Sequence, residues 1–171
     1  DIVGFTKAAS CTDPSALVQY LDFLFGQMDD VCEKLCVEKI KTVGDCYMCV
    51  GFESACVLHE SATSRVVAVA ESLHVIAART CLQSKPMSIR VGVHAGPVVT
   101  GIIGKSKFTF DLWGDAVGVA SRLESSGLPG CTHISVDVYD KLQDKTAFTP
   151  GDPVEIKGKG TLLTYISKAN P

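Results

Sequence analysis

A long helical pattern followed at once by a hairpin pattern constrains the fold of this chain more than any other feature. Asp13-Pro14 is a typical helix start, with a polar cap and a proline in the first turn. Apolar residues then recur at steps of three and four, which predicts one long amphipathic helix with this stripe in the core: Leu17, Leu21, Leu24, Phe25, Met28, Cys32 and Leu35. Residues 38–42, the turn Gly44-Asp45 and residues 46–52 predict a β-hairpin directly after it.

The remaining sequence alternates helical and strand patterns, with no internal repeats, linkers or low-complexity stretches. Helices are predicted over residues 63–81, 115–125 and 136–142, and strands over 88–94, 98–103, 108–112, 133–135, 154–156 and 163–166. The inward face of the first of these helices is expected to consist of Val66, Val67, Ala70, Leu73, Ile76 and Ala77. Interspersed hairpins and helices predict an α+β domain, with helices on one face of a mainly antiparallel sheet.

Size and charge narrow the functional classes. A chain of 171 residues with 46% hydrophobic residues is expected to form one domain over residues 1–171. A net charge of −3 gives no electrostatic case for a nucleic-acid partner. No apolar run approaches the roughly 18 residues of a spanning helix, so we expect a soluble, cytoplasmic domain. Because the chain starts on a motif residue, Asp1, we also expect a fragment of a longer protein that lacks an upstream strand.

Eight cysteines raise the question of a metal or redox site: Cys11, Cys32, Cys36, Cys46, Cys49, Cys56, Cys81 and Cys131. They show no zinc-finger spacing, and on a strand Cys46 and Cys49 would point to opposite faces. We therefore expect reduced, small, semi-apolar core residues. A redox-sensing role is the alternative.

Two carboxylates mark the candidate site. Asp1 opens the motif Asp-Ile-Val-Gly-Phe-Thr, and Asp45 follows in Thr-Val-Gly-Asp-Cys-Tyr. Carboxylates on neighbouring strand ends can hold a pair of divalent cations against a nucleoside triphosphate. Either motif alone is weak, because an aspartate beside a glycine is usually a turn residue.

Three further segments accompany the two carboxylates: Ile-Arg-Val-Gly-Val-His at 89–94, Leu-Trp-Gly-Asp at 112–115 and Ile-Lys-Gly-Lys-Gly at 156–160. Together the motifs resemble the catalytic domain of the class III nucleotidyl cyclases over nearly the whole chain. The resemblance implies a ferredoxin-like core, the class III cyclase homology domain. It also implies two Mg²⁺ or Mn²⁺ ions bound by Asp1, Asp45 and the backbone carbonyl of Ile2.

The resemblance assigns reading of the base to Lys41 and Asp111. A lysine only donates hydrogen bonds and an ionised aspartate only accepts them, which matches the N1 acceptor and N6 donor of adenine. Guanine would leave buried polar groups unpaired, and guanylate cyclases would carry Glu and Cys at these positions. Taken alone, Lys41 would be a solubility lysine on an edge strand and Asp111 a helix-entry carboxylate.

The resemblance also assigns the phosphate contacts. Arg122 corresponds to the arginine that stabilises charge on the α-phosphate, and Arg90 and Lys157 to residues that bind the β- and γ-phosphates. Each of the three could instead be an ordinary surface charge. Gly118 departs from the family, which has an asparagine one helical turn before this arginine. His94, without a partner in the sequence, is interpreted as structural.

These assignments predict an adenylate cyclase that converts ATP to cyclic AMP and pyrophosphate. In the family the metal ligands come from one subunit, and the base-reading and α-phosphate residues from the other. A single chain that carries both sets predicts a homodimer with two shared sites, fused in the full-length protein to a regulatory or membrane domain. The alternatives are a guanylate cyclase that uses GTP and, because of Gly118, a weakly active regulatory half. A redox or metal-thiolate module is a further, weaker alternative.

Overall fold

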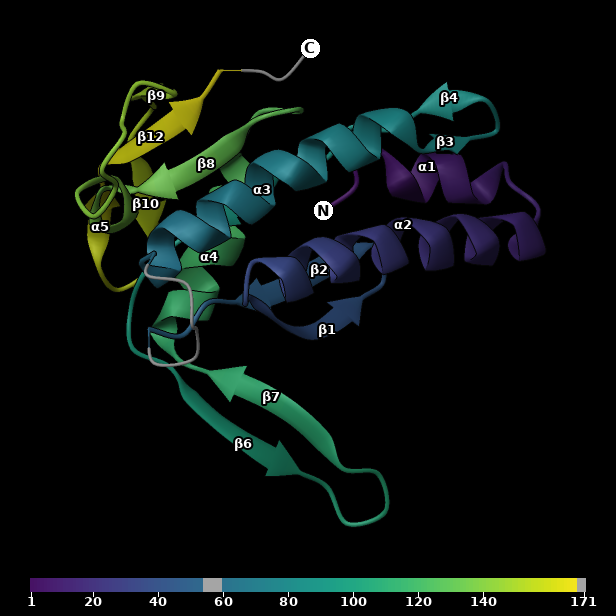
Figure 1. The fold of residues 1–171 in the computed structure, drawn as a ribbon, viewed down its shortest axis with the longest axis horizontal. Helices are drawn as coiled ribbons and strands as arrows, with labels where there is room; N and C mark the ends of the chain where they lie inside the picture. The colour runs from purple at the N-terminus through teal and green to yellow at the C-terminus, as the bar shows by residue number, and fades with distance from the viewer. Residues whose placement is uncertain (54–59, 169–171) are drawn as a thin grey trace.

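The computed structural model describes residues 1–53 and 60–168, so the predicted core cysteine Cys56 lies outside the described residues (Figure 1). The helices are α1 (Phe5–Ser10), α2 (Pro14–Lys34), α3 (Ala62–Arg79), α4 (Asp115–Ser126) and α5 (Val136–Tyr139). The strands are β1 (Glu38–Val43), β2 (Cys46–Val50), β3 (Cys81–Leu82), β4 (Lys85–Pro86), β5 (Val91–Val93), β6 (Val99–Ile103), β7 (Thr109–Trp113), β8 (Thr132–Ser135), β9 (Phe148–Pro150), β10 (Val154–Ile156), β11 (Gly160–Leu162) and β12 (Thr164–Ser167).

The predicted helix and hairpin at the start of the chain are confirmed. The Asp13 carboxylate accepts from the backbone N–H groups of Ser15 and Ala16 and so caps α2. The predicted apolar stripe of α2 packs into the largest core cluster, against α3. Strands β1 and β2 pair antiparallel around the two-residue turn Gly44-Asp45, where Gly44 adopts a φ of 62° that glycine tolerates without strain.

A buried arginine ties α3 to this hairpin. Arg65 has no exposed surface, and its guanidinium donates to the backbone carbonyls of Leu35 and Cys36 at the end of α2. It also donates to the carbonyl of Phe52 just after β2, at 2.8 Å. Arg65 thereby supplies donors to carbonyls left open where a helix and a strand end.

The sheet that carries the site has the strand order β5-β8-β12-β9. Its pairs are antiparallel except β5 with β8, which run parallel. The α+β class and the mainly antiparallel pairing are thus confirmed. Hairpin β6–β7 extends away from the body of the domain (Figure 1), and most of its apolar side chains are exposed: Val99, Ile102, Ile103, Phe108, Phe110 and Trp113.

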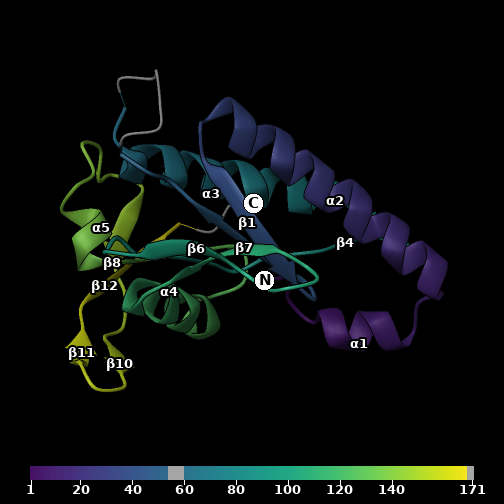
Figure 2. The same ribbon diagram turned by 90° about the horizontal axis from the view of Figure 1, so that it is seen from below.

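The helices cover both faces of this sheet, whereas one face was predicted. Val93 packs with Val67 of α3 on one face of β5. On the other face, a Cβ built on Gly92 would lie only 2.3 Å from the backbone nitrogen of Glu124 in α4. The missing side chain of Gly92 therefore lets α4 lie directly against the strand, and Figure 2 shows α3 and α4 on opposite sides of β8 and β12.

Short elements account for most of the differences from the predicted boundaries. Helix α1, strands β9 and β11 and the hairpin β3–β4 were not predicted, and the last of these ends α3 at Arg79 instead of residue 81. Its turn has positive φ at both Gln83 and Ser84, which the sequence pattern does not signal. Helix α5 ends at Tyr139, three residues earlier than predicted. Within the described residues, no helix is both long enough and apolar enough to span a bilayer.

Candidate active site

The first carboxylate is fixed by backbone pairing beside β5. The Asp1 nitrogen donates to the carbonyl of Arg90 at 3.0 Å, and the Arg90 nitrogen donates to the carbonyl of Asp1 at 2.9 Å. Two residues on, the Val3 nitrogen donates to Ser88, and Ile2 is buried in the core between them. The start of the chain thus runs antiparallel to residues 88–90, and the Asp1 side chain lies where β5 begins.

One guanidinium joins two carboxylates at this point. Arg90 donates from Nη2 to Asp1 at 3.1 Å and from Nε to Glu124 at 2.8 Å. All three side chains are partly buried, with exposed fractions of 27% for Arg90, 26% for Asp1 and 18% for Glu124. Glu124 was not predicted as a site residue. A signal existed, because Ala116, Ala120 and Glu124 follow one another at four-residue steps on one face of α4.

The second carboxylate lines the same cavity as the first. Asp45 lies in the turn between β1 and β2, and its side chain and that of Asp1 both border this cavity. Within residues 1–53 and 60–168 the Asp45 carboxylate has no hydrogen-bond or ion-pair partner. Among the described residues, the Ile2 carbonyl accepts a long hydrogen bond of 3.3 Å from the Phe5 nitrogen, and its second lone pair can accept a further ligand.

This set of oxygens fits a hard divalent cation. Two carboxylates and a carbonyl are the ligands that Mg²⁺ and Mn²⁺ prefer, and the Arg90 guanidinium already places a positive charge on Asp1. Among the described residues, no cluster of three or more His, Cys, Asp or Glu side chains forms an alternative metal site.

The cavity that these residues share has a volume of about 940 Å³. Residues 45–53 and 89–98 all line it without a break. Because side chains of a strand alternate between faces, an unbroken lining means that the cavity meets the edges of β2 and β5. Its deep wall is apolar and includes Met28, Val69 and Leu73, whereas its polar part includes the two aspartates and Arg90. Only the polar part suits phosphate groups and metal ions.

The two predicted base-reading residues meet. Lys41 of β1 donates from Nζ to the Asp111 carboxylate of β7 at 2.5 Å. This hydrogen bond, with a second from the Leu112 backbone N–H, lowers the pKa of the Asp111 carboxyl group below its ordinary value. Asp111 is therefore an ionised acceptor at neutral pH, beside a lysine donor.

Arg122 and Lys157 lie elsewhere. Arg122 is exposed on α4, and Lys157 is exposed in the turn between β10 and β11; neither lines the cavity that holds Asp1 and Asp45. The turn of Lys157 is held to the start of α4 by an ion pair between Lys159 and Asp115. Gly118 faces open space, since a Cβ built there would contact nothing within 4 Å.

His94 has partners that the sequence did not reveal. Its Nδ1 lies 2.8 Å from the Ser135 hydroxyl and 3.7 Å from the Asp137 carboxylate, and burial lowers the pKa of its imidazole. It lines the cavity but lies on the β8–α5 side. These contacts agree with the structural role expected for His94.

The cysteines are only in part the core residues that were expected. Cys32 and Cys131 are buried, but Cys11 and Cys81 are exposed. A hydrogen bond from Cys49 lowers the pKa of the Cys32 thiol to about 7, and the same bond raises the pKa of Cys49. This pair joins α2 to β2 inside the core, where both thiols pack among apolar side chains.

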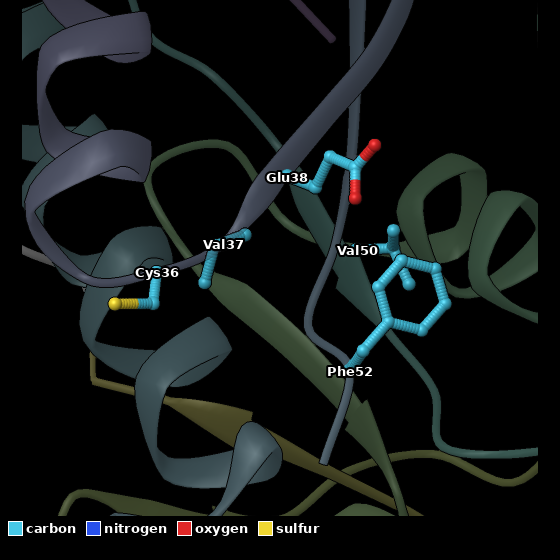
Figure 3. Close-up of a pocket in the computed structure, with 5 residues that line it drawn as sticks. All are labelled: Cys36, Val37, Glu38, Val50 and Phe52. Carbon is cyan, nitrogen blue, oxygen red and sulfur yellow. The ribbon is translucent and has the colours of Figure 1, made fainter. Parts of the chain in front are cut away.

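A second pocket lies at the other end of the hairpin. Figure 3 shows its lining, which consists of Cys36, Val37, Glu38, Val50 and Phe52 around about 200 Å³. Because Glu38 pairs with Val50 at the open end of the hairpin, this pocket lies roughly 17 Å along the strands from the turn of Asp45. Its apolar walls and single carboxylate offer nothing that would bind a triphosphate.

Comparisons with known proteins identify the family of this chain. The family model described as the adenylate and guanylate cyclase catalytic domain matches residues 1–169. An adenylate cyclase of Mycobacterium tuberculosis (strain ATCC 25618 / H37Rv) is 38% identical over 166 residues, which is 96% of this chain and 37% of that protein. Guanylate cyclase soluble subunit beta-2 of Rattus norvegicus is 34% identical over 168 residues, 96% of this chain and 24% of that protein.

Solved structures give the same result for the fold. The guanylate cyclase domain of RhGC from Catenaria anguillulae, in complex with GTP, superposes with a TM-score of 0.90 at 31% identity, covering 100% of this chain and 93% of that one. The catalytic core of a rhodopsin-guanylyl cyclase with converted specificity, in complex with ATPαS, gives a TM-score of 0.90 at 32% identity and covers 99% and 92%. The overall fold of this chain is therefore shared by solved cyclase domains.

Proposed function

This chain belongs to the family of adenylate and guanylate cyclase catalytic domains, and from that premise we propose that it is an adenylate cyclase, which converts ATP to 3′,5′-cyclic AMP and pyrophosphate. The observation that carries the choice of substrate is the contact between Lys41 and Asp111. The chain spans 37% of the mycobacterial relative and less of the rat relative, so the activity of the whole protein is part of this proposal.

The base-reading pair matches adenine. The Lys41 ammonium can donate to adenine N1, and the ionised Asp111 carboxylate can accept from the N6 amine. Guanine would present its O6 acceptor to Asp111, so two acceptors would face each other in a partly buried site. Guanine would therefore leave Asp111 without a donor, which is expected to favour ATP.

The metal ligands we propose are Asp1, Asp45 and the carbonyl of Ile2. Two Mg²⁺ or Mn²⁺ ions bound there would lower the pKa of the ribose 3′-hydroxyl and neutralise the phosphates. The chain's own contribution is positioning: backbone bonds to residues 88–90 hold Asp1, and the Gly44-Asp45 turn holds the second carboxylate. In our proposal Arg90 and Lys157 bind the β- and γ-phosphates, and Arg122 stabilises charge on the α-phosphate.

We propose that the active form is a homodimer with two shared sites. Arg122 and Lys157 are exposed and lie outside the cavity of the two aspartates, which is expected if a partner subunit supplies them. The exposed apolar side chains of β6–β7, with Phe108 76% and Ile102 68% exposed, offer a surface for that partner. Related guanylyl cyclase domains of the RhoGC fusion protein from Blastocladiella emersonii have been solved as a dimer and as a monomer.

We further propose that the domain works in the cytoplasm, joined to regulatory or membrane segments. This agrees with the greater length of its relatives, among them adenylate cyclase type 9 of Gallus gallus, of which the chain covers 12%.

Product detection tests the function. The purified chain is incubated with Mn²⁺ and either ATP or GTP, and cyclic AMP, cyclic GMP and pyrophosphate are quantified. The proposal expects cyclic AMP and pyrophosphate in equal amounts, with ATP preferred over GTP. Release of inorganic phosphate without a cyclic product would contradict it.

Guanylate cyclase activity is the second candidate, because relatives of both kinds match the chain along nearly its whole length. A weakly active regulatory half is favoured by one feature, Gly118, which removes an amide from the face of α4 that carries Arg122. The GTP arm of the same assay identifies the first alternative, and nucleotide binding without turnover identifies the second.

A further inference from the structure

We propose that Glu124 is a positioning residue for the reaction, because it accepts a hydrogen bond from Arg90 Nε and keeps that side chain in place. The Nη groups of Arg90 then move from the Asp1 carboxylate to a phosphate of the substrate. In the nucleotide-free protein Arg90 is then the cation on the Asp1 carboxylate, and metal binding there releases it. This inference rests on the proposed function, because it assigns a metal to Asp1 and a phosphate to Arg90.

The two bonds of Arg90 leave it with donors to spare. Its Nε donates to Glu124 at 2.8 Å and its Nη2 donates to Asp1 at 3.1 Å. A guanidinium carries five N–H donors, and no other described residue is seen to accept from the remaining three. Arg90 lines the cavity. It can therefore turn its Nη groups to a phosphate without breaking the bond from Nε to Glu124.

The position of Glu124 depends on the packing of α4 against β5. A Cβ built on Gly92 would lie 2.2 Å from the carbonyl oxygen of Ala120 and 2.3 Å from the nitrogen of Glu124, so only glycine permits this approach. Arg90 is two residues before Gly92 and points to the same face of the strand. The helix thus brings Glu124 to Arg90, the basic side chain that contacts Asp1 among the described residues.

Charge explains why the arrangement supports exchange. Two carboxylates share one guanidinium, so the group carries a net negative charge that a divalent cation can neutralise. Glu124 already accepts one hydrogen bond from the guanidinium, so Arg90 is bound less strongly to Asp1 than it would be otherwise. A metal ion can therefore replace Arg90 at Asp1 more easily. Without Glu124, Asp1 would be the remaining ionic partner of Arg90 among the described residues, and a metal ion would have to displace the whole guanidinium from Asp1.

A double-mutant cycle on nucleotide-free protein tests the inference without turnover. Mn²⁺ binding to the full chain at about 0.15 M salt is measured by electron paramagnetic resonance for wild type, Glu124→Gln, Arg90→Gln and the double variant. Glu124→Gln is expected to weaken Mn²⁺ binding about three- to tenfold, and Arg90→Gln to strengthen it severalfold. In the Arg90→Gln background the effect of Glu124→Gln is expected to shrink to twofold or less. Glu71→Gln, at an exposed position on α3, is the matched control and is expected to change nothing.

A spectroscopic measurement keeps the positioning role separate from metal binding and from catalysis. The Arg90 Nε–H signal in ¹H–¹⁵N spectra is expected to be protected from exchange in wild type, to persist when Mg²⁺ is added, and to be lost in Glu124→Ala. An unchanged signal in Glu124→Ala, or strictly additive effects in the cycle, would overturn the inference. If both measurements follow expectation but no cyclic nucleotide is formed, the proposed function fails while the positioning role stands.

Discussion

Lys41 and Asp111 are separated by 70 positions in the chain, yet their side chains form an ion pair at 2.5 Å between β1 and β7. The pair unites a donor and an ionised acceptor that sequence motifs assigned separately to base recognition. Strand β7 belongs to the projecting hairpin, so this ion pair also ties that hairpin to the β1–β2 hairpin.

Exchanging this pair should change the preferred nucleotide. In the double variant Lys41→Glu with Asp111→Cys, the ratio of kcat/KM for ATP to that for GTP is expected to fall about tenfold or more, because a carboxylate can accept from guanine N1 and N2. Lys39→Gln, on the same strand but paired with Asp29, is the control and should leave the ratio unchanged. An unaltered ATP preference in the double variant would mean that these residues do not read the base.

Two inactive chains should restore one working site between them. Asp45→Ala and Arg122→Ala are each expected to lose about a hundredfold or more of the activity, because one lacks a metal ligand and the other a transition-state charge. In an equal mixture, half of the dimers are mixed and each has one intact site, so about a quarter of wild-type activity is expected. A mixture as inactive as its components would refute sites shared between subunits.

Gly118 can be replaced without steric cost, because a Cβ there meets nothing within 4 Å. Gly118→Asn is expected to raise kcat about tenfold by adding an amide on the face of α4 that carries Arg122. Gly118→Ala separates this effect from helix propensity: it should raise the free energy of unfolding by about 1 kcal/mol and leave kcat unchanged. Equal gains in kcat for both variants would show that the amide has no role.

Gly92 should tolerate no side chain. In Gly92→Ala the new methyl group would overlap backbone atoms of α4, so the free energy of unfolding is expected to fall by about 2–3 kcal/mol, as measured by urea denaturation. The matched control is Gly26→Ala in α2, where a Cβ would contact nothing and stability should rise by about 0.5–1 kcal/mol. Similar stability for both variants would contradict the close packing of α4 on β5.

The buried His74 should make the fold sensitive to mild acid. Burial lowers the pKa of its imidazole from 6.5 to about 4, and its Nε2 lies 3.0 Å from the Thr132 hydroxyl. Between these pH values the unfolded chain binds the extra proton, so stability falls as pH decreases from 6.5 to about 4, by about 3 kcal/mol in total. His74→Gln should flatten this part of the urea-denaturation profile, and an unchanged slope would assign the effect to other groups.

Periodic features of the sequence predicted the fold well. The apolar stripe of α2, the Gly44-Asp45 turn and the boundaries of β10 lie where the pattern placed them, because each depends on residues close together in the chain. The hairpin β3–β4 has only two residues in each strand, too few to establish an alternating pattern. Arg65 was not predicted as a core residue because a sequence pattern treats an arginine as a surface residue. Its burial depends on hydrogen bonds to backbone carbonyls in two other segments, at Leu35–Cys36 and Phe52.

At the candidate site, too, the features carried by local motifs were predicted and those that depend on long-range contacts were not. The motifs named Asp1, Asp45, Lys41 and Asp111, and the structure brings each pair together or into one cavity. Glu124 escaped prediction because its contact with Arg90 depends on how closely a helix approaches a strand, which no local pattern records. Whether Arg122 and Lys157 join the aspartates is a property of two chains and stays a prediction.

The hydrogen bonds between Asp1 and Arg90 have a practical consequence for anyone who produces this protein. In a longer chain, a residue ahead of Asp1 that continued this antiparallel pairing would lie beside Val91 of β5. A purification tag placed directly at that position would lie close to Asp1, so a spacer should separate the two. Handles for affinity capture or surface immobilisation are better placed away from Asp1, for example after the exposed Lys168.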